Sequence, residues 1–456
     1  MLGFGTIVLI LLLVTNAQTV FEEFIGSPVH DLAVLLILGR SILAIRSGVN
    51  IADVARRFKK FALAIGLLSA FGAIRLFGDT FGVAASQAGS FPEAWLKDML
   101  IVVALVAGSV SLQRVTRLSW LMTGSIAILA GPALIQHLTG TYDFQWGGLA
   151  TNETGFIDGE ERVQIGGPLG SANPLAQWLL VALPFAMHFT VAGRRIEHRV
   201  AAGAMVLLAI GGIIATQSRQ GMLVLLLLVG LWTVFYSRPS PKTLVRVAAV
   251  GVLVVGLVVA ANPSRWVRQV ERMGEVSALF GADIDPQSSA AGYAGTFWAG
   301  YDMFVDNPVG GVGHGNFAVN YIEYVDERGI DGSGKARSAH NLVIHLLAET
   351  GIVGTVTFVS GFALVVSLLR TARSRLRAYE FHADAELAAA DAGLATALLL
   401  SLATWSAVSL FQGLFHTEQI VVVIGLALGF AWAADSTRLT EYLEPAVEVP
   451  PLASHV

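Results

Sequence analysis

Long runs of apolar residues alternate with short polar segments along most of the chain. Each run is close to the ~20 residues that an α-helix needs to cross the hydrocarbon core of a membrane. Such spans have to be helical, because lipid offers no hydrogen-bond partners to the backbone. We therefore predict an all-α integral membrane protein with about twelve transmembrane helices, near residues 2–19, 29–47, 59–78, 96–112, 118–138, 174–192, 200–216, 220–236, 243–261, 341–369, 393–411 and 417–434.

The basic residues of the short connections predict the orientation of these spans. Lys and Arg concentrate in the connections on the cytoplasmic side of membrane proteins. With twelve spans, the arginine-rich short connections all fall on one side, which is predicted to be cytoplasmic and to hold both termini. The basic residues on that side are Arg46, Arg56, Arg57, Lys59, Lys60, Arg114, Arg117, Arg194, Arg195, Arg199, Arg238, Lys242, Arg246, Arg370, Arg373, Arg375 and Arg377.

The external side is predicted to carry two long loops, of which the second is larger and partly helical.

An alternative interpretation of the N-terminus is a signal peptide cleaved near Ala17, which leaves the remaining topology unchanged. The chain then divides into helices one to nine (1–261, with a loop at about 139–173), the large loop (262–339), helices ten to twelve (340–434) and a cytoplasmic tail (435–456).

Composition supports this class and excludes others. The 456 residues are 54% hydrophobic and only 14% charged, with a mean hydropathy of +0.66, whereas soluble domains are nearer 25% charged. A net charge of −4 gives no general basic field for nucleic acid. The absence of cysteine excludes disulfides, thiolate metal sites and cysteine nucleophiles.

Several cationic or titratable residues are predicted to lie at the external face. Arg219 stands in the very short turn Thr216–Gly221, next to Ser218, where positive charge is disfavoured by topology. This arginine either caps a helical hairpin and extends to the headgroups or binds a ligand. The other residues of this set are Arg265, Arg268, Arg272, His340 and His416.

His340 opens a predicted span and begins a polar stripe. Asn341, His345 and Glu349 follow at intervals of four residues, which places them on one helical face. A carboxylate as deep as that of Glu349 has to be paired, protonated or close to water. We interpret His340 as a residue that takes part in the reaction, and Asn341 and His345 as residues that line the approach to it. Glu349 is interpreted as a structural tie to a neighbouring helix.

Two motifs resemble cofactor or metal sites without their usual context. Asp283-Ile284-Asp285 has the pattern of a metal-dependent glycosyltransferase triplet, but it stands in a loop before Pro286. Gly311–Gly315 lacks the βαβ unit of a dinucleotide site and is typical of a tight turn after Asn307-Pro308. The sequence therefore predicts no metal site and no cofactor.

The chain resembles the bacterial O-antigen ligase and O-antigen polymerase superfamily in four ordered pieces. These pieces are Gly170–Ala176, Thr216–Gly221, Trp298 with Asn307–Phe317, and His340-Asn341 through Ala348–Gly351. The resemblance implies a metal-independent glycosyltransferase that uses a polyprenyl-diphosphate-linked glycan at the periplasmic face of the inner membrane. It also implies that His340 is essential and that Arg219 binds the diphosphate together with an arginine of the large loop.

The sequence departs from these relatives at one position. They often carry an arginine about four residues before the loop tryptophan, whereas Tyr293–Phe297 precede Trp298 here. Arg265 is our first candidate for the second diphosphate-binding residue, followed by Arg268 and Arg272.

The residue types fit the implied chemistry. Arginine is permanently charged and holds phosphate oxygens bidentately, and a histidine can accept a proton from a hydroxyl at neutral pH. We predict an O-antigen ligase-like enzyme whose acceptor is lipid A–core. Polymerisation of O-antigen or exopolysaccharide and transfer to a protein hydroxyl remain alternatives with the same donor, and a transporter or flippase is an alternative from another class.

Overall fold

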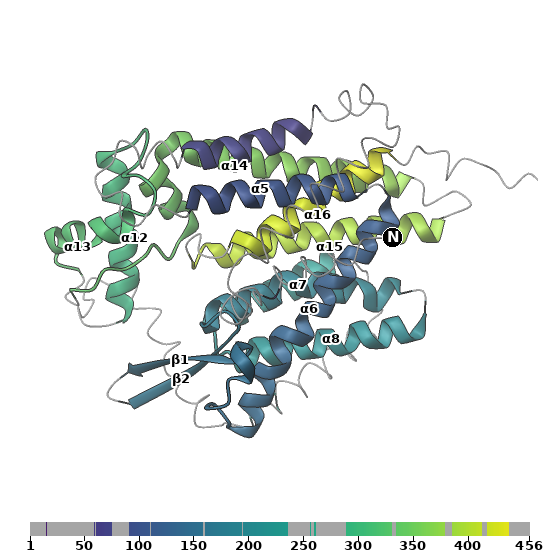
Figure 1. Cartoon of the computed structure of the whole chain (residues 1–456), viewed down its shortest axis with the longest axis horizontal. Helices are drawn as coiled ribbons and strands as arrows, with labels where there is room; N and C mark the ends of the chain where they lie inside the picture. Colours follow the sequence, from purple (N-terminus) through teal and green to yellow (C-terminus); the bar gives the residue numbers. More distant parts are fainter. Residues whose placement is uncertain are drawn as a thin grey trace, which may run out of the picture.

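The computed structural model describes most of the chain as helices packed side by side, with one short two-stranded sheet (Figure 1). The described residues are 61–74, 91–109, 111–157, 160–193, 195–235, 289–330, 334–378, 385–412 and 417–436, with Thr15, Lys59, Gly256 and Ala260. The helices are α5 (Phe91–Gly108), α6 (Leu112–Thr139), α7 (Ala172–Ala192), α8 (Ile196–Ala215), α9 (Arg219–Phe235), α12 (Ser289–Asp306), α13 (Phe317–Arg328), α14 (Leu342–Ala378), α15 (Ala385–Ser409) and α16 (Thr417–Ser436).

Within the described residues, five helices are long and apolar enough to cross a membrane: α6, α7, α8, α14 and α15. Shorter apolar helices occupy Phe61–Ile74, Asp98–Gly108, Arg219–Phe235 and Gln419–Asp435. All of these coincide with predicted spans, so the mostly helical membrane fold is confirmed. The predicted spans 2–19, 29–47 and 243–261 lie almost entirely outside the described residues, and the number twelve stays a prediction.

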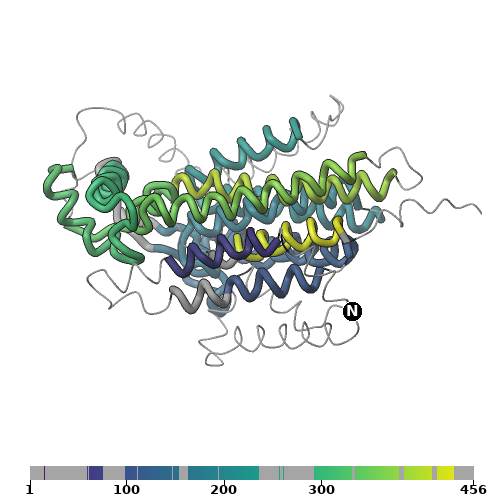
Figure 2. Tube along the Cα trace, turned by 90° about the horizontal axis from the view of Figure 1, so that it is seen from above, coloured from purple at the N-terminus to yellow at the C-terminus, as the bar shows by residue number. Residues whose placement is uncertain are grey.

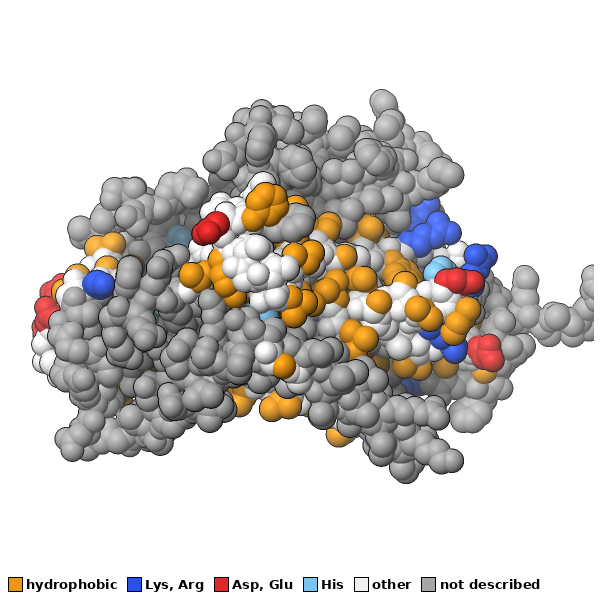
Figure 3. Space-filling model, turned by 90° about the horizontal axis from the view of Figure 1, so that it is seen from below, with side chains coloured by type: hydrophobic (Ala, Val, Ile, Leu, Met, Phe, Trp, Pro, Cys, Tyr) orange, Lys and Arg blue, Asp and Glu red, His pale blue; other side chains and the backbone are white. Residues whose placement is uncertain are grey.

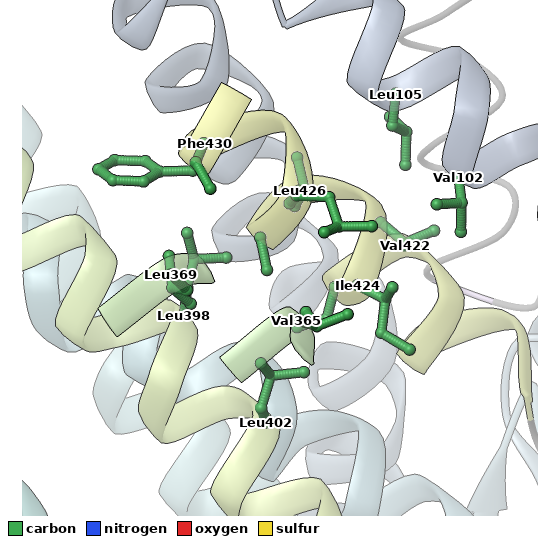
Figure 4. Close-up of a cluster of buried hydrophobic side chains, with 14 of the residues drawn as sticks. Val102, Leu105, Val365, Leu369, Leu398, Leu402, Val422, Ile424, Leu426 and Phe430 are labelled. Carbon is green, nitrogen blue, oxygen red and sulfur yellow. The ribbon is translucent and has the colours of Figure 1, made fainter. Parts of the chain in front are cut away.

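The core of the bundle lies where α5, α14, α15 and α16 meet (Figure 4). Gly425 and Gly429 of α16 let this helix approach α5 closely. A Cβ at Gly425 would come within 2.5 Å of Leu105, and one at Gly429 within 2.3 Å of Ser109. Small residues four apart are a recurrent device for close helix packing in membranes. The apolar side chains labelled in Figure 4 are Val102, Leu105, Val365, Leu369, Leu398, Leu402, Val422, Ile424, Leu426 and Phe430.

The two ends of the bundle differ in chemistry. Helices α12 and α13 lie across one end, which we call the α12 end (Figures 1 and 2). Lys and Arg side chains gather toward the opposite end (Figure 3). There, Arg375 of α14 pairs with Asp435 of α16 at 2.6 Å.

A β-hairpin occupies part of the first predicted loop, where the sequence indicated only a connection. Strand β1 (Thr151–Ile157) pairs antiparallel with β2 (Glu160–Gly167), in a register that sets Thr151 opposite Gly167 and Ile157 opposite Glu160. It follows the short 3-10 turn η1 (Trp146–Gly148). Strand β2 packs against α6 and α7. The purely helical prediction is therefore wrong for this loop.

Candidate functional site

A pocket of about 140 Å³ lies at the α12 end, beside the start of α14. Helix α12 supplies one wall, the residues before α14 supply another, and the end of α15 supplies the third. The lining residues are Tyr293, Thr296, Phe297, His340, Asn341, Leu410 and Phe411. Of the polar residues predicted from the sequence, His340 and Asn341 therefore open onto this pocket.

Asn341 fixes the position of His340 by capping α14. Its side-chain oxygen accepts hydrogen bonds from the backbone N–H groups of Val343 (2.9 Å) and Ile344 (3.1 Å). These are two of the N–H groups that a helix start leaves without partners. Its side-chain nitrogen donates to the carbonyl of Leu410 at 2.9 Å, which ties the start of α14 to the end of α15.

The imidazole of His340 is half-buried between an aromatic ring and a cation. The ring of Tyr293 lies 5.2 Å from it, centroid to centroid, at an interplanar angle of 48°. Burial, and secondarily the positive charge of Arg337, hold the pKa of His340 below its ordinary value. A histidine with a lowered pKa is mostly neutral near pH 7, which is the form that accepts a proton.

Arg337 is a residue that the sequence interpretation missed. Its guanidinium carbon lies 2.6 Å from where a Cβ would stand on the buried Gly292 of α12. Only a glycine leaves this space open, so α12 and the segment before α14 bring a cation beside His340. No arginine stands just before Trp298, and the cation beside His340 is instead Arg337, which follows Trp298 by 39 residues.

Helix α14 is broken at Gly351, and the loop after α12 fills the break. Gly351 has φ 59° and ψ −163°. The N–H groups of Val312 and Gly313 donate to the carbonyls of Ala348 (2.8 Å) and Glu349 (3.1 Å), while Ile352 N–H donates to the Pro308 carbonyl (2.9 Å). The predicted continuous span therefore contains a break, and the loop satisfies backbone groups that the break frees.

Glu349 fastens the same loop from its side chain. Its Oε2 atom lies 3.1 Å from Nδ1 of His314 in the loop and 3.0 Å from Nε2 of His345, one turn earlier in α14. The carboxylate is only 4% exposed, so these partners offset the cost of burying it. His345 also faces Phe317, at 6.3 Å between ring centroids, and is not one of the pocket-lining residues.

Arg219 is the first residue of α9 and follows a turn that is held by hydrogen bonds of the Ser218 side chain. The Ser218 hydroxyl donates to Oδ1 of Asn173 (2.7 Å) and accepts the backbone N–H of Gly221 (3.1 Å). A Cβ at Gly221 would come within 2.7 Å of Ala176, so the turn lies directly on the start of α7. The side chain of Arg219 is half-buried.

Arg219 and His340 lie at the same end of the bundle but are not neighbours in the pocket lining. Asn341 bonds to Leu410 at the end of α15, and Gln419 at the start of α16 donates to the carbonyl of Trp178 in α7 at 2.8 Å. Helix α15 packs against both α9 and α14. Helix α15 thus lies between the helix that begins with Arg219 and the helix that follows His340.

Part of the predicted site lies outside the described residues. This applies to Arg265, Arg268, Arg272 and His416, and to Asp283 and Asp285. In the part of the chain that the structure describes, no group of three or more His, Cys, Asp or Glu side chains has the arrangement of a metal site.

The four sequence pieces that resemble O-antigen ligases form two contacting pairs. Asn173 meets Ser218, and the loop Asn307–Phe317 fills the break in α14. Residues 204–359, about a third of the chain, match the family model of O-antigen ligase. This match makes the segment similar to O-antigen ligase and supports the resemblance of the chain to that superfamily. No curated protein matches the chain in sequence. The matched segment contains both Arg219 and His340.

Proposed function

We propose that this protein is an O-antigen ligase-like enzyme that moves a glycan from a polyprenyl-diphosphate carrier to a hydroxyl of lipid A–core. The family consists of glycosyltransferase-type membrane enzymes. The observation that carries the proposal is the pocket at the α12 end, where the half-buried His340 meets Tyr293 and Asn341. A lipid-linked donor can keep its prenyl chain beside the apolar helices while its headgroup reaches this end.

In the proposed reaction, His340 accepts the proton of the acceptor hydroxyl. The new bond joins that oxygen to the anomeric carbon of the donor sugar, and the bond from this carbon to the phosphate oxygen breaks. The leaving diphosphate gains negative charge, which nearby guanidinium groups stabilise. We assign this role to Arg219 with one of Arg265, Arg268 and Arg272, and we add Arg337 as a further cation beside the reacting centre.

The sidedness of the protein is part of the same proposal. More of the described Lys and Arg side chains lie toward the end opposite α12 than beside α12 (Figure 3), and an excess of such residues favours the cytoplasmic side. We therefore place the pocket at the periplasmic face of the bacterial inner membrane, with both termini in the cytoplasm. His416 follows the end of α15 in sequence and is kept as a supporting residue.

The broken helix α14 is the one observation that favours a transporter, because discontinuous helices often form transport sites. In such sites the freed backbone groups face a cavity and bind the substrate. Here Val312, Gly313 and Ile352 take part in hydrogen bonds that close the break. The break therefore serves to anchor the loop, and glycan transfer remains the better interpretation.

The choice of acceptor can be tested in a strain that lacks the gene. A ligase is expected to leave lipid A–core without long glycan chains while lipid-linked polymer accumulates. If the core instead carries a single repeat unit, the protein is a polymerase, and if both patterns stay normal while a glycoprotein disappears, it is a protein transferase. Lipopolysaccharide banding and glycoprotein staining separate these results.

The lowered pKa of His340 predicts how transfer depends on pH. Because the neutral imidazole is the base, transfer is expected to persist below pH 6.5, the ordinary pKa of histidine, and to fall only as pH drops through the lowered value. Arg337→Gln removes a positive charge that lowers this pKa, so the acid limb of the rate profile should move to higher pH. The measurement is the initial rate between about pH 4.5 and about pH 8.5, which is about two units on either side of the ordinary histidine pKa.

The exposed cation Lys335, two residues from Arg337, provides the matched control. Lys335→Gln removes the same charge from the segment and should leave the acid limb nearly in place. An acid limb that is identical in the wild type and in Arg337→Gln contradicts the assigned electrostatic link.

A further inference from the structure

Helix α12 carries a continuous stripe of exposed aromatic side chains, which we call the α12 stripe: Tyr293, Phe297, Trp298 and Tyr301. Trp298 is 40% exposed and Tyr301 is 45% exposed, whereas Thr296, Ala299 and Met303 on the opposite face are buried. Exposed aromatic rings that form a row are uncommon on a protein surface without a binding role. The α12 stripe is therefore typical of a binding surface.

The stripe begins in the His340 pocket. Tyr293 and Phe297 are themselves pocket-lining residues, and Trp298 and Tyr301 follow within the next turn or so of the helix. The distance from Tyr293 to Tyr301 along the axis is about 12 Å, at ~1.5 Å per residue. A ligand that places its reacting end beside His340 can thus continue along the exposed face of α12.

The indole of Trp298 is held in a fixed orientation. Phe297 and Tyr301 contact it edge-on, with centroids at 5.5 Å and 5.9 Å and interplanar angles of 90° and 85°. The guanidinium of Arg328, at the end of α13, lies 4.8 Å from its ring centroid. A side chain that is ordered before binding loses little entropy when a ligand arrives.

Arg328 is itself fixed by a two-point ion pair with Asp302 of α12. Its Nη2 donates to Oδ1 at 2.6 Å, and its Nε donates to Oδ2. Trp298 stays 40% exposed with this guanidinium over its ring, and the carboxylate oxygens of Asp302 lie next to the guanidinium. Sugars match this arrangement, because their C–H faces pack on aromatic rings while their hydroxyls exchange hydrogen bonds with charged groups at the edge.

The charges of α12 argue against the membrane surface as the occupant. Helices that lie in the headgroup region combine aromatic residues with Lys and Arg, which attract anionic lipids. The charged residues of α12 are Asp302 and Asp306, and both are acidic. A neutral or hydroxyl-rich ligand suits this surface better than a lipid headgroup.

We propose that the α12 stripe binds glycan, with sugar units stacked on Trp298 and Tyr301 beyond the unit that reacts beside His340. The inference rests on the proposed function, because the pocket gives the stripe its starting point. The glycan can belong to the donor or to the acceptor, since both carry the same chemistry.

The test compares substrates of different glycan length with purified full-length protein in lipid nanodiscs. One arm varies the donor from a single sugar to a repeat polymer on the same prenyl diphosphate, and the other arm varies the length of the core acceptor. Trp298→Ala is expected to raise the KM of the longer glycan about tenfold in one arm. The kcat should change little, and the single-sugar donor should be unaffected. The arm in which the KM rises shows whether the α12 stripe binds the glycan of the donor or that of the acceptor.

Two controls separate stacking from folding. Trp298→Phe keeps an aromatic face and should retain most of the affinity. Phe144→Ala removes another exposed ring, between α6 and the hairpin, and should change neither KM. The proposal is overturned if Trp298→Ala slows long and short substrates equally, as a membrane contact or a folding defect predicts.

Failure of the proposed function gives a different result. If the wild-type protein transfers nothing, the stripe is judged by its affinity for carrier-free oligosaccharide, measured by saturation-transfer NMR. Binding that Trp298→Ala weakens about tenfold and Trp298→Phe retains supports the stripe. Equal binding by all three proteins, or none, refutes it.

Discussion

Alanine at His340 is expected to lower glycan transfer by about 10²–10⁴-fold, the usual contribution of a positioned proton acceptor. The protein should still fold, because the side chain of His340 is half-buried at the edge of a pocket and the helix start is capped by Asn341. Transfer is measured as restoration of long glycan chains in a strain without its own copy, alongside the amount of protein in the membrane.

Two further variants define the role of the imidazole. His340→Gln keeps a polar side chain of similar length but offers no base at neutral pH, so it should be nearly as inactive as alanine. His198→Ala changes an exposed histidine near the opposite end of the bundle and should be fully active. Normal transfer by His340→Ala, at normal protein levels, would remove His340 from the mechanism.

Alanine at Gly351 is expected to detach the loop Asn307–Phe317 from α14 and to abolish most activity. The backbone there has φ 59° and ψ −163°, a conformation that is essentially restricted to glycine. A Cβ would also stand 2.3 Å from the carbonyl oxygen of Val309. Strain and overlap together should cost about 3 kcal/mol or more.

The effect of Gly351→Ala can be followed by the midpoint of thermal unfolding in detergent and by protease cleavage within the loop. Gly310→Ala is the matched control, since a Cβ at Gly310 meets nothing within 4 Å and its φ is not positive. We expect Gly310→Ala to unfold like the wild type and Gly351→Ala to unfold at clearly lower temperature with a protease-sensitive loop. Equal unfolding of both variants contradicts the anchoring role of the break.

The spans were the most predictable part of the fold. Hydrophobic length alone placed helices at 118–138, 174–192 and 341–369, and the structure has α6, α7 and α14 at these positions. Lipid offers no hydrogen-bond partners to the backbone, so an apolar run of this length is nearly sufficient to predict a helix. The hairpin was missed because its strands are largely polar, although Asp158-Gly159 is a turn sequence typical of hairpins.

The break in α14 was not visible in the apolar pattern. Gly351 follows Glu349-Thr350 inside one predicted span, and its conformation depends on the loop that begins at Asn307-Pro308. Glycines at 311, 313 and 315, all with positive φ, made the turn itself predictable. These glycines could not indicate that the turn fills a break in a helix. The break is at Gly351, which is 40 residues after Gly311.

The candidate site was only partly predictable for the same reason. His340 and Asn341 were identified by their position at the start of a span, and both line the pocket. Tyr293, Phe297 and Arg337 were missed because their relation to His340 is created by the packing of α12 against α14, as the contact of Arg337 with Gly292 shows. The diphosphate role of Arg265, Arg268 or Arg272 stays a prediction.

The central claim is that the pocket beside His340 transfers a glycan from a lipid diphosphate without a metal ion. The most direct measurement uses purified full-length protein with a polyprenyl-diphosphate-linked glycan and lipid A–core, in the presence of EDTA. We predict transfer by the wild type and a rate at least about a hundredfold lower with His340→Ala. A wild-type protein that is inactive toward every acceptor, or that loses its activity with EDTA, would contradict the claim, and the second result would direct attention to Asp283 and Asp285.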